Sequence, residues 1–394
     1  VADVPAEHLV LGGGAPVYHR ETKRPSYLDD TAAFDIDSVP DVRPGEVQDV
    51  LLRLLSSPNI ASKRWVFEQY DTMVRTNTLV GPGPSDAAIV RIKGTNKALA
   101  LKTDCNGRYV YLNPRKGGQI AVAEAARNVV CAGGKPLAIT NCLNFGNPYK
   151  PEVYWVFKEA VGGMGDACRT FDTPVTGGNV SFYNENPEGA VFPTPTIGML
   201  GLVEDVEKHT TTADFKQEGD VILLLSPKDW FARNDIGGSE YLALVHQTTA
   251  GDAPHLDLHE EQAVQEALLK LIRMGLVRSA HDVADGGLAV CLAESVIFSR
   301  NLGARVDLPQ DENVRLDAAL FGEAQSRIVF TVKQADLGAV REALSGSPVQ
   351  VQQLGEVTSS GFQISVSGEK VVDLSNEDLR KPYEETIPAI MGKS

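Results

Sequence analysis

Apolar residues follow two different periods along this chain. Between residues 72 and 203, short apolar runs typical of strands alternate with two long stretches whose apolar residues recur at i, i+3 and i+4 spacing. The long stretches predict amphipathic helices over 119–131 and 151–171, and the polar residues 93–97 predict a hairpin turn. The short runs predict strands at 73–80, 87–92, 98–101, 136–139, 175–182 and 195–203.

The same alternation returns after residue 220. A continuous apolar run at 220–226 predicts a buried strand. Further strands are expected at 326–332, 349–356 and 362–366, and helices at 241–246, 258–274, 287–299 and 335–344. Because strands alternate with helices in both parts, the sequence predicts two α/β (α+β) units.

Three segments interrupt this pattern. Residues 1–45, rich in Pro, Gly, Asp and Arg, predict a connector that lies along a surface. Helices are expected after it at 44–55 and 62–69. Charge rises over 204–218, and the tail from Asn376 is polar and broken by prolines. The predicted organisation is a connector at 1–45, one domain at 46–205 and a second domain at 206–394.

Polar groups gather where two of the predicted strands end. The first strand runs into Lys102, Thr103 and Asp104. Thr140, Asn141, Asn144 and Asn147 follow the second strand. Gly117 and Gly118 are expected to open the helix between these strands. Carboxylate, amide and glycine backbone at one edge favour a phosphate or Mg²⁺–phosphate site. For Asp104 alone, a strand-end cap is the commoner role.

The charge and composition of the chain limit the kinds of molecule that it can bind and the compartment in which it is expected. The formal net charge of −15 argues against nucleic-acid and anionic-membrane binding, and no apolar run is long enough to span a bilayer. Five cysteines without a CxxC pair predict free thiols in a reducing cytoplasm. The start at Val1 carries no secretory signal and suggests a fragment or a processed product. Neither a GxxxxGK[ST] nor a GxSxG motif occurs, and the histidines have no ligand spacing.

Four stretches carry a family resemblance. DCNGRYVYLNPRKGGQIAVAEAARNVVCAGGKPLAITNCLNFGNP at 104–148 resembles the second half of phosphoribosylformylglycinamidine synthase, within the aminoimidazole ribonucleotide synthetase (PurM)-like superfamily. PVTGGNVSFYN at 174–184, GGSEY at 237–241 and AHDVADGGL at 280–288 agree with it. The resemblance implies a PurM-like N-terminal domain, whose sheet pairs into a shared barrel, followed by a PurM-like C-terminal domain.

The resemblance also implies chemistry and partners. The family makes an amidine from formylglycinamide ribonucleotide with ATP, Mg²⁺ and ammonia. The implied partners are the first half of the same enzyme or a second copy of this chain, a glutaminase subunit (PurQ) and a small bridging subunit (PurS). Two alternatives stay open: a self-sufficient homodimeric ATP-dependent synthetase or kinase, and a non-catalytic nucleotide-binding scaffold.

Site residues are implied at one strand end. By resemblance, Asn141 and Gly178 contact ATP, Asn179 holds Mg²⁺ and Ser181 contacts substrate in the active site of the first half. Asn141 departs from the family, which usually has Asp there. Period-2 alternation is expected to let Asn141, Asn179 and Ser181 converge. Without the resemblance, a glycine bulge with turn-forming Asn is the more probable interpretation of 177–181.

The cleft within this half resembles an active site that has lost its catalytic residues. The family's first half has a base histidine and a metal-binding Asp where this chain has Asn106 and Asn128, so no catalytic residue is expected in this half. A structural nucleotide site is implied at Asp104, Gly117, Gly118 and Arg127. Glu323 and Arg327 are expected to be structural. His281 and Asp282 with Asp285–Gly287 predict either an anion loop or an N-cap cluster, about equally.

Overall fold

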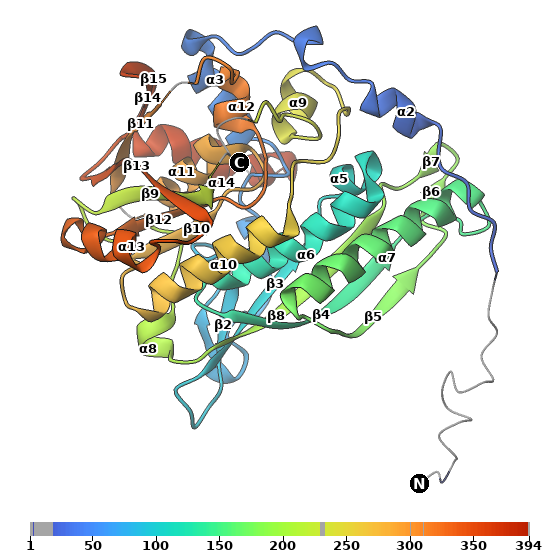
Figure 1. Ribbon diagram of the computed structural model, residues 1–394, viewed down its shortest axis with the longest axis horizontal. Helices are drawn as coiled ribbons and strands as arrows, with labels where there is room; N and C mark the ends of the chain where they lie inside the picture. Colours follow the sequence, from blue (N-terminus) through green and yellow to red (C-terminus); the bar gives the residue numbers. More distant parts are fainter. Residues whose placement is uncertain (1–2, 4–18, 229–232, 300, 310, 393–394) are drawn as a thin grey trace.

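Two β-sheets with helices packed on them make up the chain (Figure 1). In the computed structural model the described residues are 3, 19–228, 233–299, 301–309 and 311–392, so most of the first half of the expected connector lies outside them. Both sheets mix strands with helices, and the predicted α/β class is confirmed. Within the described residues, no helix combines the length and apolar character needed to cross a membrane.

The first sheet has the strand order β1-β2-β3-β8-β4-β5, and only its β4–β5 pair is parallel. Two helices, α6 (Pro114–Cys131) and α7 (Pro151–Phe171), cover one face. The strands are β1 (Thr78–Val80), β2 (Ala88–Arg91), β3 (Ala98–Asp104), β4 (Lys135–Asn144), β5 (Val175–Ser181) and β8 (Thr194–Val203).

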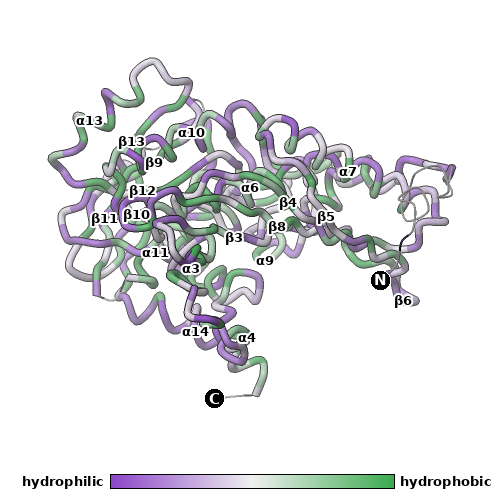
Figure 2. Tube along the Cα trace, turned by 90° about the horizontal axis from the view of Figure 1, so that it is seen from below, coloured by the Kyte–Doolittle hydropathy of each residue, from purple (hydrophilic) through white to green (hydrophobic). Residues whose placement is uncertain are grey.

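The opposite face of this sheet is open, as the apolar strand runs predict. In Figure 2, α6 and α7 lie on one side of β3, β4, β5 and β8. Along β8, residues buried against the helices alternate strictly with half-exposed ones. Leu99 pairs with Leu202 and Leu101 with Leu200, and Leu101 is 40% exposed. One end of the open face is therefore apolar.

Helix α6 lies at the centre of the molecule. It packs on β3 and β8, on α7, and on α10 (Leu258–Arg273) of the second unit. It was expected to be amphipathic, but it is buried on nearly all sides. Many of its residues are small and its buried charges are paired, and both features make this burial possible. Its start was also placed wrongly. The helix begins at Pro114, capped by the Asn113 side chain, and Gly117 and Gly118 lie inside it.

One part of the second sheet is buried on both faces. The strand order of the whole sheet is β10-β12-β9-β13-β11-β14-β15. Every residue of β9 (Val221–Pro227) is buried, with alternate side chains in two different hydrophobic clusters. The other strands are β10 (Ser279–Asp282), β11 (Gly303–Leu308), β12 (Ile328–Val332), β13 (Val349–Thr358), β14 (Phe362–Val366) and β15 (Glu369–Leu374).

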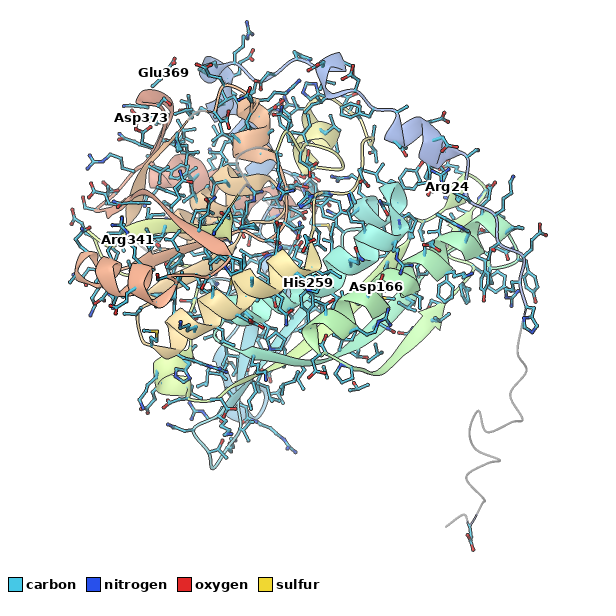
Figure 3. The ribbon with its side chains drawn as sticks, viewed as in Figure 1. Arg24, Asp166, His259, Arg341, Glu369 and Asp373 are labelled. Atoms are coloured by element: carbon cyan, nitrogen blue, oxygen red, sulfur yellow. The ribbon has the colours of Figure 1, made fainter. Side chains whose placement is uncertain are left out.

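Helices cover both faces of the second sheet. Helices α10 and α13 (Leu337–Ala343) pack with one of its hydrophobic clusters. The other cluster contains α9 (Glu240–Val245), α11 (Gly287–Phe298), α12 (Leu316–Phe321) and α3 (Val47–Leu55). Helix α3 precedes the first sheet in sequence, but its apolar stripe packs in the core of the second unit. Exposed charges such as Arg341 and Glu369 lie at the periphery (Figure 3).

Several predicted elements need correction. Met73–Asn77 is not a strand, since it contains a 3-10 turn with Arg75 and Thr76 at positive φ, and only β1 remains. Strand β4 continues through Asn144, beyond the predicted end. The tail forms α14 (Asn376–Ile390), which tolerates two prolines and packs beside α3 and α4 (Arg64–Phe67).

The remaining elements are short. Strands β10, β11 and β15 were not predicted from the sequence, nor was α5 (Gly107–Leu112). The connector contributes α2 (Tyr27–Ala32), α8 (Val206–His209) follows β8, and β6 (Glu185–Asn186) pairs with β7 (Gly189–Ala190).

Close approach of α6 and α7 depends on glycines. A Cβ added at Gly163 would clash with the Arg115 carbonyl, and one at Gly118 with the Ala160 carbonyl. We expect Gly163→Ala to lower the free energy of unfolding by about 1–3 kcal/mol, because the helices must separate. Gly338→Ala, in α13 with open space around it, should be neutral or stabilising. Equal destabilisation of the two variants in urea unfolding would contradict this interpretation.

Candidate functional sites

Strand register assigns the polar residues of β4 and β5 to different faces. Asn141 pairs with Gly178 and with Ile197, which is fully buried under the helices. Residues paired across strands share a face, so Asn141 lies on the helix-covered face. Asn179 pairs with Cys142, and Ser181 with Asn144, on the open face. The predicted convergence of Asn141 with Asn179 and Ser181 is therefore wrong, since odd and even positions of β4 point oppositely.

Asn141 and Gly178 form one unit. Gly178 has φ +156°, and a Cβ added there would clash with the Asn141 side-chain oxygen. Only glycine leaves room for the Asn141 amide at this position.

The open face is polar at the end where Asn179 and Ser181 lie. Asn179 Nδ2 lies 3.5 Å from Ser181 Oγ. The main chain beyond Ser181 is fixed, because the Ser181 carbonyl accepts from Phe145 N at 3.0 Å and from Asn184 Nδ2 at 2.8 Å. Tyr183, at φ 63°, makes the turn that follows. Amide and hydroxyl oxygens suit Mg²⁺ bound to phosphate, while the negative charge that such an ion also prefers must come from elsewhere.

A second polar site lies in a cleft of about 270 Å³ between the two units. It is unusually acidic for a buried location. Its charged and amide lining consists of Asn59, Asp86, Lys102, Asp104, Glu124, Asn128, His281, Asp282, Asp285 and Glu294. So many carboxylates around one cavity favour binding of a hard cation through oxygen ligands.

Asp104 lies at the end of β3 and faces this cleft. Lys102 Nζ is 3.7 Å away. Burial raises the pKa of Asp104 to about 6, with the nearby Asp282 and Asp285 adding to the shift and Lys102 opposing it. Glu124 shows the same effect, since burial and the charge of Asp104 hold its pKa well above the usual range. Ionising the carboxylates of the cleft therefore destabilises the fold.

His281 joins the two units at the back of the cleft. Its Nδ1 lies 2.7 Å from Asp86 and its Nε2 3.1 Å from Glu294. Burial alone would lower the pKa of His281, but the charge of Asp86 and both hydrogen bonds hold it well above its usual value. The ring is therefore an imidazolium at neutral pH. One ligand atom each from Asp86, His281 and Asp282 lie within 4.8 Å of one another.

The contacts of the 281–287 segment support neither the anion loop nor the N-cap cluster that the sequence predicted. His281 and Asp282 belong to β10, and Gly286, at φ 79°, precedes α11 without a side-chain cap. The Gly286 amide donates to Glu323 at 2.7 Å, so it is not free for an anion. Asp285 instead accepts from Asn106 Nδ2 at 3.0 Å.

Arg127 and the two helix glycines have structural positions. Arg127 is fully buried and donates to Glu261 at 2.9 Å and to Gln325 at 2.7 Å. The Gly117 amide donates to the Asn113 carbonyl, and both glycines lie in tight packing contacts. The phosphate contacts expected of Gly117, Gly118 and Arg127 are therefore unavailable in this conformation, and only Asp104 of that set faces the cleft.

The expected structural residues behave as predicted. Glu323 accepts from the amides of Glu240 and Gly286 and pairs with the Tyr109 hydroxyl. The buried Arg327 donates to the carbonyls of Gly322 and Ala324. The five cysteines are free thiols.

Sequence reasoning missed Asp86, Glu124 and Glu294. Glu124 and Asn128 are spaced i, i+4, so they share a helix face, and this spacing was a usable signal. Asp86 and Glu294 meet His281 only through contacts between distant segments, for which the sequence pattern offers no local sign.

The raised pKa of Asp104 generates a pH prediction. Its folded value of about 6 exceeds the ordinary 3.8, so the stability it contributes is complete below pH 3.8 and is lost as pH rises through 6. Asp104→Asn removes this loss. We expect the variant to gain on the order of 1–3 kcal/mol relative to the unsubstituted chain between pH 4 and pH 7. Urea unfolding across this range measures it, with exposed Glu369→Gln as control; parallel curves would contradict it.

Known proteins agree with this architecture. Residues 84–203 match the family described as AIR synthase related protein, N-terminal domain, and residues 217–367 match its C-terminal domain. The chain is 63% identical over 380 residues to phosphoribosylformylglycinamidine synthase subunit PurL of Salinibacter ruber, covering 96% of this chain and 50% of that protein. It thus spans about half the length of the curated relatives it matches.

Solved structures share the fold. T. maritima PurL complexed with FGAR superposes with a TM-score of 0.70 at 18% identity, over 86% of this chain and 54% of that one. The structure of PurLQS from Thermotoga maritima gives a TM-score of 0.66 at 17% identity, over 86% and 52%. The two family matches follow each other in order and together cover more than half of the chain, which therefore belongs to the family of AIR synthase related proteins.

Proposed function

We propose that this chain is the C-terminal half of a phosphoribosylformylglycinamidine synthase. In the proposed reaction ATP phosphorylates the amide oxygen of formylglycinamide ribonucleotide, and ammonia then displaces phosphate to leave the amidine. The observation that carries the proposal is the polar end of the uncovered sheet face, where the neutral side chains of Asn179 and Ser181 lie together. An edge of this kind requires a partner to complete it.

The partner domain supplies what this edge lacks. The first half would place its base and carboxylates opposite Asn179 and Ser181. Mg²⁺ bound there would neutralise charge that develops on the phosphate oxygens. Asn179 would hold the ion through its amide oxygen, Ser181 would orient the substrate, and Asn141 with Gly178 would contact the nucleotide from the other face of the sheet. No residue of this half is assigned proton transfer.

The apolar end of the open face supports pairing with another such domain. Two sheets that close against each other into a shared barrel would bury Leu101 and Leu200. We assign that place to the first half of the enzyme, in line with the half-length match to the relatives. A PurQ glutaminase and a PurS subunit would deliver ammonia, as the PurLQS assembly of T. maritima suggests. The free thiols favour a cytoplasmic location.

The cleft of this half is assigned a structural nucleotide. T. maritima PurL structures are described as complexes with ADP and with ATP. Asp104 and its neighbours Glu124, Asn128 and Asp282 would hold Mg²⁺ and, through it, phosphate. Asn106 caps α5 and binds Asp285, so it cannot serve as a base. The cleft should therefore bind the nucleotide without turning it over.

ADP and Mg²⁺ titrated calorimetrically into the partnered chain should release heat, and no binding would reject this assignment.

Two other functions remain distinguishable. A self-sufficient homodimer would hydrolyse ATP with substrate and ammonia alone, whereas a scaffold would bind nucleotide but never restore activity to a first half. The contacts of Asn106 argue against independent catalysis and against proton transfer in this half.

The two polar sites should respond differently to substitution. In the reassembled enzyme, Asn179→Ala should cost about 2.7–4 kcal/mol at the transition state, roughly a hundredfold or more in kcat, because a positioned oxygen is lost. Asn106→Ala, which removes only a hydrogen bond to Asp285 of the cleft, should cost far less. Steady-state kinetics with both halves measures this, and circular dichroism checks folding. Equal losses would reject the division into a working edge and a structural cleft.

The isolated chain should self-associate through its open face. We expect dimers in sedimentation velocity at micromolar concentration, because unpaired leucines on a sheet face favour a second copy. Leu101→Lys should shift the chain towards monomer. Met274→Lys, at an exposed apolar residue that follows α10, should not. A monodisperse monomer of the unsubstituted chain would count against this pairing face.

A further inference from the structure

Asn144 shares the open face with Asn179 and Ser181. It is paired with Ser181 on β5 and with Thr194 on β8. Its Nδ2 also lies 3.6 Å from the sulfur of Cys142, the residue paired with Asn179. Neighbouring strands are about 4.8 Å apart, so the Asn144 side chain stands next to the Ser181 hydroxyl.

The orientation of the Asn144 amide is fixed by its contacts. Its nitrogen donates to the Cys142 carbonyl at 3.1 Å and to the Thr194 carbonyl at 3.3 Å. Carbonyl oxygens only accept hydrogen bonds, so the nitrogen must face them and Oδ1 must face away. Within the described part of the chain, no donor is bonded to Asn144 Oδ1.

Asn179 repeats this arrangement on the neighbouring strand. Its Nδ2 faces Ser181 Oγ, and among the described residues no donor is bonded to its Oδ1. Two amide oxygens, from Asn144 and Asn179, therefore flank one serine hydroxyl on the same face. A pair of neutral acceptors repels phosphate oxygens but attracts a cation, and amide oxygens are ordinary ligands of Mg²⁺.

We propose that Asn144 is a second metal-binding residue of this half and presents its amide oxygen to the same Mg²⁺–nucleotide ion that Asn179 holds. This deepens the proposed function and rests on it for the identity of the nucleotide. Asn144 binds the ion, while its two backbone contacts aim the oxygen.

Metal binding tests the assignment without turnover. The probe is Mn²⁺ with a non-hydrolysable ATP analogue, followed by electron paramagnetic resonance in the full two-half protein. Asp104→Asn is included throughout to silence the cleft. Asn144→Ala should weaken Mn²⁺ binding about tenfold or more, as should Asn179→Ala. The double variant should lose clearly less than the sum, because both residues hold one ion.

Thr176→Ala is the matched control. Its hydroxyl donates to the Ile139 carbonyl at 3.1 Å on the same strand pair, but it is not one of the residues that flank Ser181. It should leave Mn²⁺ affinity unchanged. An equal loss in Thr176→Ala, an unchanged affinity in Asn144→Ala, additive losses, or no Mn²⁺ binding by the Asp104→Asn protein would each overturn the assignment. Normal Mn²⁺ behaviour in a protein that forms no amidine would reject the proposed function and leave Asn144 as a ligand.

Discussion

One buried cation, Arg127, holds the two units at a fixed distance. It extends from α6 of the first unit and meets Glu261 and Asp282 of the second, with no part of it exposed to water. Removing one member of such a buried pair typically costs about 3–5 kcal/mol, because the other charge is left without a partner. The cleft depends on this contact. Asp104 reaches it from β3 and Asp282 from β10, so their separation is set where α6 meets the second sheet.

The first sheet separates two kinds of chemistry by its two faces. Asp104 and Asn141 both pair with Ile197 and share the helix-covered face, where burial makes ionised groups costly. Asn179, Ser181 and Asn144 occupy the open face, where they offer neutral donors and acceptors. A shift of one residue in the β4–β8 register would turn each side chain of β4 to the opposite face of the sheet. The register is therefore as much a part of the chemistry as the residue types.

Much of the fold followed from apolar periodicity. Helix α7 and strand β14 match their predicted bounds, because each carries a strong period between clear breakers. Strands β10 and β15 were missed, since they are short and carry charged residues that interrupt the apolar pattern. At the site, Asn141, Asn179 and Ser181 were predicted to converge, but the register places Asn141 on the other face. The face on which Asn141 lies depends on the length of β4, which the prediction ended too early.

Helix α3 has a consequence for synthesis on the ribosome. Its leucines Leu51, Leu54 and Leu55 pack in a core that includes β9, which emerges much later. At about 5–20 residues per second, the helix waits on the order of ten seconds before that strand exists. During this interval an apolar stripe is exposed on a nascent chain whose first sheet is being completed. Until β9 is made, this exposed stripe favours contact with chaperones that recognise short leucine-rich segments, so the order of translation matters for how this core is completed.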